Sequence, residues 1–162
     1  MNMLDRLLGH DLAATQEILQ LCLDLSDEDM DRDFDVGWRT LRKTLNHMIG
    51  NIEVWIDLMM GRPVRPASGK VSTGELLVRL NQSYTEFAQF AKQIEHDGRL
   101  DELWIDVLDK PPVQKSFGGA IGHVITHNMH HRAELQHILH RLGVTDVPEG
   151  DLMAWDQQNR PT

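Results

Sequence analysis

Apolar residues recur every three or four positions over most of the chain, and this spacing predicts four long amphipathic helices. We expect them at about residues 3–24, 39–61, 75–94 and 120–142. The stripe of the first helix consists of Leu4, Leu7, Leu8, Leu12, Ile18, Leu19 and Leu23. That of the second consists of Leu41, Leu45, Met48, Ile49, Ile52, Trp55, Ile56 and Met59. Four such helices in one small chain predict an all-α four-helix bundle.

The segments between the helices have a different composition. Residues 25–37 are acidic and end in glycine, and residues 99–116 are the least helical part. There, two short apolar runs flank Asp109-Lys110-Pro111-Pro112, which predicts a small hairpin or an ordered loop before the last long helix. A final short turn is expected at residues 151–156. The whole chain, 1–162, is expected to form one domain.

The composition is that of a folded protein, with 41% hydrophobic and 25% charged residues. The formal charge of −9 argues against non-specific nucleic-acid binding, because phosphate contacts need clustered Lys and Arg. Cys22 is the only cysteine, so neither an intramolecular disulfide nor a thiolate metal cluster can form. The chain shows no signal-peptide pattern, and no apolar run approaches the roughly 20 residues of a membrane span. We therefore expect a cytoplasmic protein without a membrane partner.

Three histidines, His123, His127 and His131, recur at every fourth position in the last predicted helix. They share one helix face, and neighbouring pairs have Cβ atoms roughly 5–6 Å apart, close enough to bind one metal ion together. All three cannot bind one ion, because the outer two are separated by about 12 Å of helix rise. The spacing allows His123 with His127 or His127 with His131, and a further ligand must come from another helix.

His47 is the best candidate for that further ligand. It lies within the second predicted helix among apolar residues, and metal sites in bundles are built from side chains on facing helices. His10 in the first helix fits less well, and His96 lies near a helix end. His137 and His140 are expected to face solvent near the end of the last helix, where positive charge is favourable.

Three other features are open to more than one interpretation. Trp38, Trp55 and Trp104 either line a pocket or pack in the core. Arg132 contacts an anionic substrate or forms an interhelical ion pair. The acidic stretch is not a calcium-binding EF-hand, because a loop starting at Asp29 puts Phe34 where glycine is needed. We expect a solvated acidic loop there.

Two segments resemble a known family. Residues 40–49 read Thr-Leu-Arg-Lys-Thr-Leu-Asn-His-Met-Ile and are followed by Trp55, and residues 123–135 read His-Val-Ile-Thr-His-Asn-Met-His-His-Arg-Ala-Glu-Leu. Both segments are similar to the DinB-like (DinB/YfiT) family, whose ligand histidines lie on the second helix and on a late helix. The resemblance covers nearly the whole chain and implies a four-helix-bundle metalloenzyme. Its implied metal ligands are His47, His127 and His131.

The same resemblance bears on the residues around these ligands. It leaves His123 without a ligand role, as a residue that orients a ligand, lines the pocket or bonds within the core. Arg132 and Trp55 are candidates for the same surroundings. Family members often have Gly and Gln after the last His-Arg, whereas this chain has Ala133 and Glu134. We expect this difference to affect the packing or the contacts around the ligands.

Characterised relatives in this family include thiol-dependent S-transferases and isomerases that use bacillithiol or mycothiol. The resemblance implies an S-transferase for small electrophiles, with a low-molecular-weight thiol as cosubstrate and a metal-bound thiol or water as nucleophile. The alternatives are a metal-dependent hydrolase and a non-catalytic, stress-related metal-binding protein. Zinc is favoured by donor type, although nickel, iron and manganese also fit such ligands. Relatives commonly pair, so the resemblance also implies a homodimer.

Overall fold

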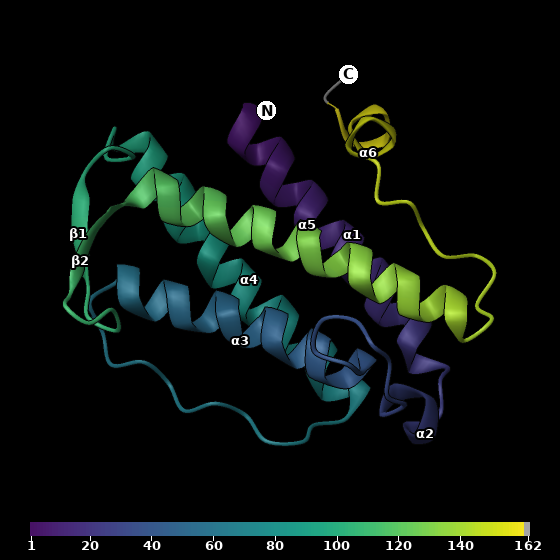
Figure 1. Ribbon diagram of the computed structural model, residues 1–162. Coiled ribbons are helices and arrows are strands. Elements are labelled where there is room, and N and C mark those ends of the chain that lie inside the picture. Colours follow the sequence, from purple (N-terminus) through teal and green to yellow (C-terminus); the bar gives the residue numbers. More distant parts are fainter. Residues whose placement is uncertain (161–162) are drawn as a thin grey trace.

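A computed structural model describes residues 1–160, which form four long helices, two short helices and one two-stranded sheet (Figure 1). The helices are α1 (Met3–Leu23), α2 (Asp27–Met30), α3 (Leu41–Met59), α4 (Thr73–His96), α5 (Phe117–Arg141) and α6 (Leu152–Asn159). The strands are β1 (Leu103–Asp106) and β2 (Val113–Ser116), which pair antiparallel. The predicted all-α bundle, with a hairpin before its last long helix, is confirmed.

The four long helices surround one apolar core. Helix α3 packs against α4 and α5, and α1 packs against the same two helices, so each long helix has two long neighbours. The apolar stripes of the sequence point inward: Leu19, Leu45, Ile49 and Leu135 are fully buried. None of the helices within residues 1–160 has the length and apolar composition needed to cross a membrane.

Polar caps set where the helices begin, and one of them corrects the predicted start of the last long helix. Helix α5 begins at Phe117 rather than near residue 120, because the Ser116 hydroxyl accepts a hydrogen bond from the Gly119 backbone N–H. Gly118 also donates its N–H to the backbone oxygen of Leu100 at 2.7 Å, and an added Cβ there would lie 3.1 Å from that oxygen. The two glycines therefore form the first turn instead of leading into it.

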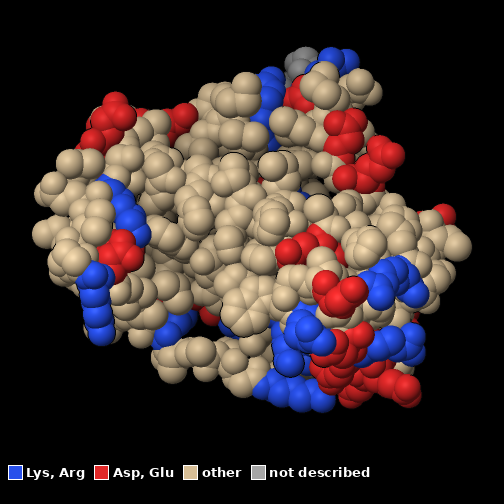
Figure 2. All heavy atoms as spheres, viewed as in Figure 1, with Lys and Arg blue, Asp and Glu red and all other residues tan. Residues whose placement is uncertain are grey.

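The acidic stretch is more ordered than the solvated loop that we expected. It contains the single turn α2, and acidic and basic side chains gather over this region of the surface (Figure 2). The ion pairs are Arg42 with Asp27 and Asp31, Arg39 with Asp33, and Arg141 with Asp35. Arg42 lies on α3, Arg39 precedes the N-cap of α3, and Arg141 lies on α5, so the pairs link the stretch to the end of the bundle.

Candidate metal centre

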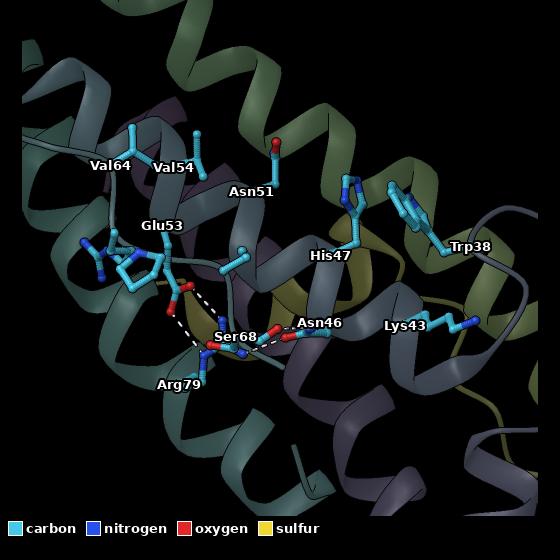
Figure 3. Close-up of a pocket in the computed structure, with 14 residues that line it drawn as sticks. Trp38, Lys43, Asn46, His47, Asn51, Glu53, Val54, Val64, Ser68 and Arg79 are labelled. Carbon is cyan, nitrogen blue, oxygen red and sulfur yellow. Dashed lines mark hydrogen bonds and ion pairs between the residues drawn. The ribbon is translucent and has the colours of Figure 1, made fainter. Parts of the chain in front are cut away.

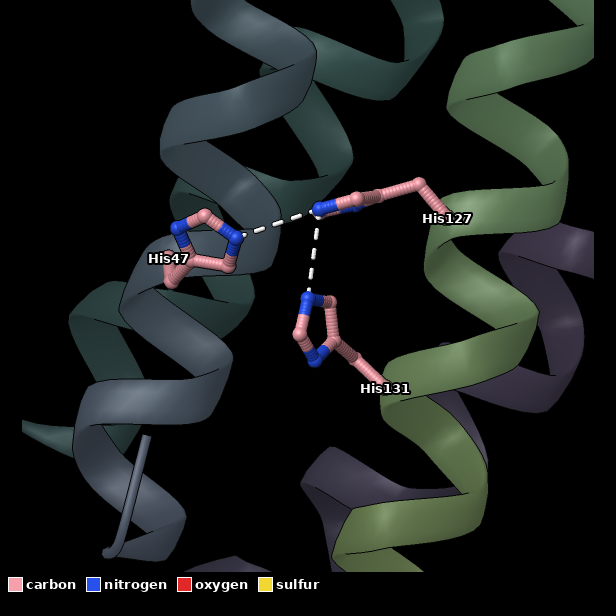
Figure 4. Close-up of side chains that lie close together, drawn as sticks. All are labelled: His47, His127 and His131. Carbon is pink, nitrogen blue, oxygen red and sulfur yellow. Dashed lines mark hydrogen bonds between the residues drawn. The ribbon is translucent and has the colours of Figure 1, made fainter. Parts of the chain in front are cut away.

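Three histidine rings from two facing helices converge between α3 and α5 (Figure 4). His47 comes from α3, and His127 and His131 come from α5. The Nε2 atom of His127 lies 3.1 Å from Nε2 of His47 and 3.2 Å from Nε2 of His131. One ring nitrogen from each residue lies within 4.8 Å of the other two. Of the two pairs that the helical spacing allowed, the structure joins His127 and His131 to His47.

This arrangement fits a metal ion better than it fits hydrogen bonding alone. A neutral imidazole nitrogen carries one hydrogen or one lone pair, so His127 Nε2 cannot satisfy two neighbouring nitrogens at once. Zinc–nitrogen bonds of about 2.0–2.1 Å in tetrahedral geometry place neighbouring nitrogens about 3.3 Å apart. The two observed separations from His127 Nε2 are close to that value.

The surroundings keep two of the rings uncharged. Burial, together with the neighbouring His131 and His47 rings, lowers the pKa of His127 to about 4. Burial also lowers the pKa of His47, with a further contribution from His131. Both imidazoles are therefore neutral near pH 7, and the neutral ring is the metal-ligating form.

Comparison with protein-family models matches this chain to the DinB family over residues 1–159. The chain belongs to the DinB family. No curated protein matches the sequence. Membership of this family and the convergence of His47, His127 and His131 together support a divalent-metal centre in this DinB-family protein.

Glu134 is the contact that orients His131. Its Oε2 atom lies 2.6 Å from Nδ1 of His131 and accepts that N–H, so the Nε2 lone pair faces the other two rings. The second carboxylate oxygen lies 3.3 Å from Nε2 of the exposed His130. Gly37, which has a φ of +48°, lies so close to this carboxylate that any Cβ there would overlap it. The acidic segment thus covers the glutamate that contacts the candidate ligand His131.

The Glu134→Gln variant should bind divalent metal about tenfold to a hundredfold more weakly than the wild-type protein. The amide can still accept the His131 N–H, but it lacks the negative charge that makes the ring a stronger donor. Affinity is measured by competition with a chromophoric chelator, and Glu17→Gln on the exposed face of α1 is the matched control. An affinity for Glu134→Gln equal to that of the control would show that the carboxylate charge does not act on the site.

His123 and Trp55 lie next to the cluster but outside it. The exposed His123 ring lies 5.6 Å from the His127 ring and 4.9 Å from the Trp55 ring, between centroids. Trp55 donates its indole N–H to Oδ1 of Asn51 at 3.0 Å, and the Asn51 amide nitrogen lies 3.2 Å from Nδ1 of His127. Trp55 thus reaches a candidate ligand through Asn51, a residue that the sequence analysis missed. Its place four residues after His47 and four before Trp55, on one helix face, was the available signal.

Arg132 faces the core instead of the site. It is 5% exposed, and its guanidinium donates to the carboxylate and the backbone oxygen of Asp11 on α1. Of the two interpretations of Arg132, the structure shows the interhelical ion pair. The alternative, in which Arg132 contacts an anionic substrate, is not what the structure shows. Consecutive residues of a helix point about 100° apart, so the turn that points His131 toward α3 points Arg132 away from it.

The other histidines, which were weaker ligand candidates in the sequence, lie away from the cluster. His10 donates from Nε2 to the backbone oxygen of Gly150 at 2.7 Å. His96 is exposed at the end of α4, and His137 and His140 are exposed near the end of α5. Among the described residues, the group that joins two long helices is therefore the one formed by His47, His127 and His131.

Proposed function

We propose that this DinB-family protein is a metal-dependent thiol S-transferase that acts on small electrophiles. The observation that carries the proposal is the three-nitrogen cluster. No carboxylate, thiol or fourth imidazole of residues 1–160 completes the group of His47, His127 and His131, because Glu134 contacts only His131 of these three, at its other ring nitrogen. Three protein ligands leave at least one position open, as in catalytic sites, whereas structural zinc sites are closed by four protein ligands. The imidazole donors favour zinc among the candidate ions.

The thiol must come from outside the protein. Cys22 is fully buried, and burial raises the pKa of its thiol to about 12, so the chain supplies no thiolate of its own near pH 7. When bound, a divalent ion lowers the pKa of a coordinated thiol and provides the thiolate at neutral pH. In the proposed reaction the thiol sulfur forms a bond to an electrophilic carbon. The leaving group departs with its bonding electron pair, and the thiol proton passes to solvent.

The residues of the chain hold and shield the reacting groups. Glu134 orients His131, and the Trp38 ring stacks on His47 with centroids 4.3 Å apart and an interplanar angle of 26°. Trp38 thereby covers the outer side of the ligand on α3 and limits the approach of water from that side. Trp104, by contrast, is 9% exposed and stacks on Phe117 in the core.

The test is a conjugation assay with metal-free protein reconstituted with zinc, nickel, iron or manganese. Bacillithiol, mycothiol and a simple thiol are each offered with monobromobimane, and the thioether is quantified by mass spectrometry. We expect conjugation above the metal-free protein with at least one ion, and its loss on chelation. No metal-dependent thioether with any combination would contradict the proposal, and metal-dependent release of a hydrolysed electrophile instead would identify a hydrolase.

A further inference from the structure

A cavity of about 530 Å³ lies beside His47, between α3 and the segment that joins it to α4 (Figure 3). This volume falls within the range of about 300–1,000 Å³ that is usual for small-molecule sites. His47 and Asn51 line it, whereas none of the three cluster histidines lines the 440 Å³ cavity beside Trp55. Of these two cavities, the larger is therefore the one that borders the histidine cluster, through His47.

The floor of the cavity is a stripe along one face of α3. Lys43, His47, Gly50 and Val54 all line it, and they follow the helical spacing of three and four residues. From the first to the last the stripe is about 16 Å long, at 1.5 Å of rise per residue. A Cβ placed on Gly50 meets no atom within 4 Å, so the missing side chain leaves open space in the middle of the stripe. Glycine within a helix lowers helix stability relative to alanine, and here it keeps the cavity open.

The two ends of the stripe differ chemically. Beyond Gly50 the apolar side chains of Val54, Val64 and Pro66 line the cavity, and the charged side chains beside them are paired with one another. At the other end stands the exposed Lys43, which forms no ion pair within 4 Å among residues 1–160, although its charge acts on the more distant Asp33. The Trp38 ring, which stacks on His47, lies at this same end of the cavity (Figure 3).

The other cations around the cavity are already neutralised. Arg79 donates to both carboxylate oxygens of Glu53, at 3.3 and 2.7 Å. Arg65 donates to both oxygens of the buried Asp57, at 2.8 and 2.6 Å. Lys43 is left as the cation of the lining that is free to pair with a ligand.

We propose that this cavity binds an elongated organic anion with an apolar body. The body lies over Gly50 between Val54, Val64 and Pro66, and the anionic group pairs with Lys43. The middle of such a molecule passes His47, which puts its reactive carbon beside the metal centre. This last step rests on the proposed transferase function. It names the electrophile as an aryl or alkyl carboxylate or sulfonate that carries a leaving group on its reactive carbon. Binding in the cavity does not depend on the reaction.

The test uses two fluorescent probes of similar shape: 1-anilinonaphthalene-8-sulfonate, which is anionic, and N-phenyl-1-naphthylamine, which is neutral. Each is titrated into the full-length protein, both metal-free and zinc-loaded, with near-ultraviolet circular dichroism confirming native packing. The Gly50→Leu variant fills the cavity and should weaken both probes at least tenfold. Gly122→Leu is the matched control, because Gly122 is also helical and a Cβ there also meets no atom within 4 Å.

Lys43→Gln tests the charge. We expect it to weaken the anionic probe about twofold to fivefold, the range of exposed ion pairs, and to leave the neutral probe unchanged. Wild-type affinity for both probes in Gly50→Leu would overturn the proposed site, and equal effects of Lys43→Gln on both probes would overturn the preference for anions. A wild-type protein that binds the probes but forms no thioether would contradict the transferase function and leave this binding site supported.

Discussion

The His127→Ala variant should lose stoichiometric divalent metal while keeping its fold. Structural zinc sites with four ligands have apparent binding free energies of about 10–16 kcal/mol, or about 2.5–4 kcal/mol for each ligand. Removing one of three ligands should therefore weaken binding by a factor on the order of a hundred to a thousand. His127 is the most informative choice, because its Nε2 atom is the one that lies beside both other nitrogens. The bound metal is measured by elemental analysis after dialysis, and the fold by circular dichroism.

His123→Ala is the matched control for this experiment. His123 lies one turn before His127 on the same helix. Its ring neighbours both Trp55 and His127 but does not join the group of His47, His127 and His131. It should therefore retain the metal content of the wild-type protein. Saturating metal should also raise the stability of the wild type and of His123→Ala by about 4 kcal/mol at a thousandfold excess over Kd. The assignment of the ligands would be contradicted if His127→Ala and His123→Ala lost metal equally, or if both kept it.

Helical periodicity predicted most of the residues of this cluster. It placed His127 and His131 on one face, and it placed His47 inside a second helix. Periodicity could not choose between His123 and His131 as the partner of His127, because both lie four residues away. That choice depends on which turn of α5 faces His47, and this is set by the packing of the two helices.

Contacts made by the irregular segments were not readable from the sequence. The approach of Gly37 to Glu134 depends on the path of the acidic stretch, and that path is held by ion pairs such as that of the buried Arg42 with Asp31. Periodicity describes regular elements, so it contains no information about such a path. The stacking of Trp38 on His47 has the same origin.

The fold itself was more predictable than the contacts around the site. The four long helices could be predicted from their apolar stripes. Each stripe is the face that its helix must bury, and the bundle buries all four faces in one core. The main error concerned the start of α5, which was expected near residue 120 and lies at Phe117. The hydroxyl of Ser116 and the close approach of Leu100 outweigh the low helix propensity of glycine at that position.

A buried polar cluster behind α5 holds the helix that carries two of the candidate ligands. Asp11 is completely buried and accepts hydrogen bonds from the Arg132 guanidinium, from the Tyr84 hydroxyl at 2.8 Å and from the Asn128 amide at 2.8 Å. Burial and the neighbouring Asp11 raise the pKa of Tyr84 well above its ordinary value, so its hydroxyl keeps the proton that it donates. One carboxylate thus links α1, α4 and α5.

The Asp11→Ala variant should therefore lower the free energy of unfolding by about 3–5 kcal/mol, because it leaves the Arg132 guanidinium buried without a counter-charge. This is a large part of the roughly 5–15 kcal/mol that stabilises a typical domain. The measurement is urea unfolding of the metal-free protein, with Asp33→Ala as the control. The Asp33–Arg39 pair is 59% exposed on both sides, so its loss should leave the midpoint unchanged.

The Asp11→Leu/Arg132→Met double variant should recover part of the stability, because the unpaired charge is gone while Tyr84 and Asn128 still lack their acceptor. If Asp11→Ala were as stable as the control, the guanidinium would have to reach water, and the ion pair could not be what fixes α5 against α1.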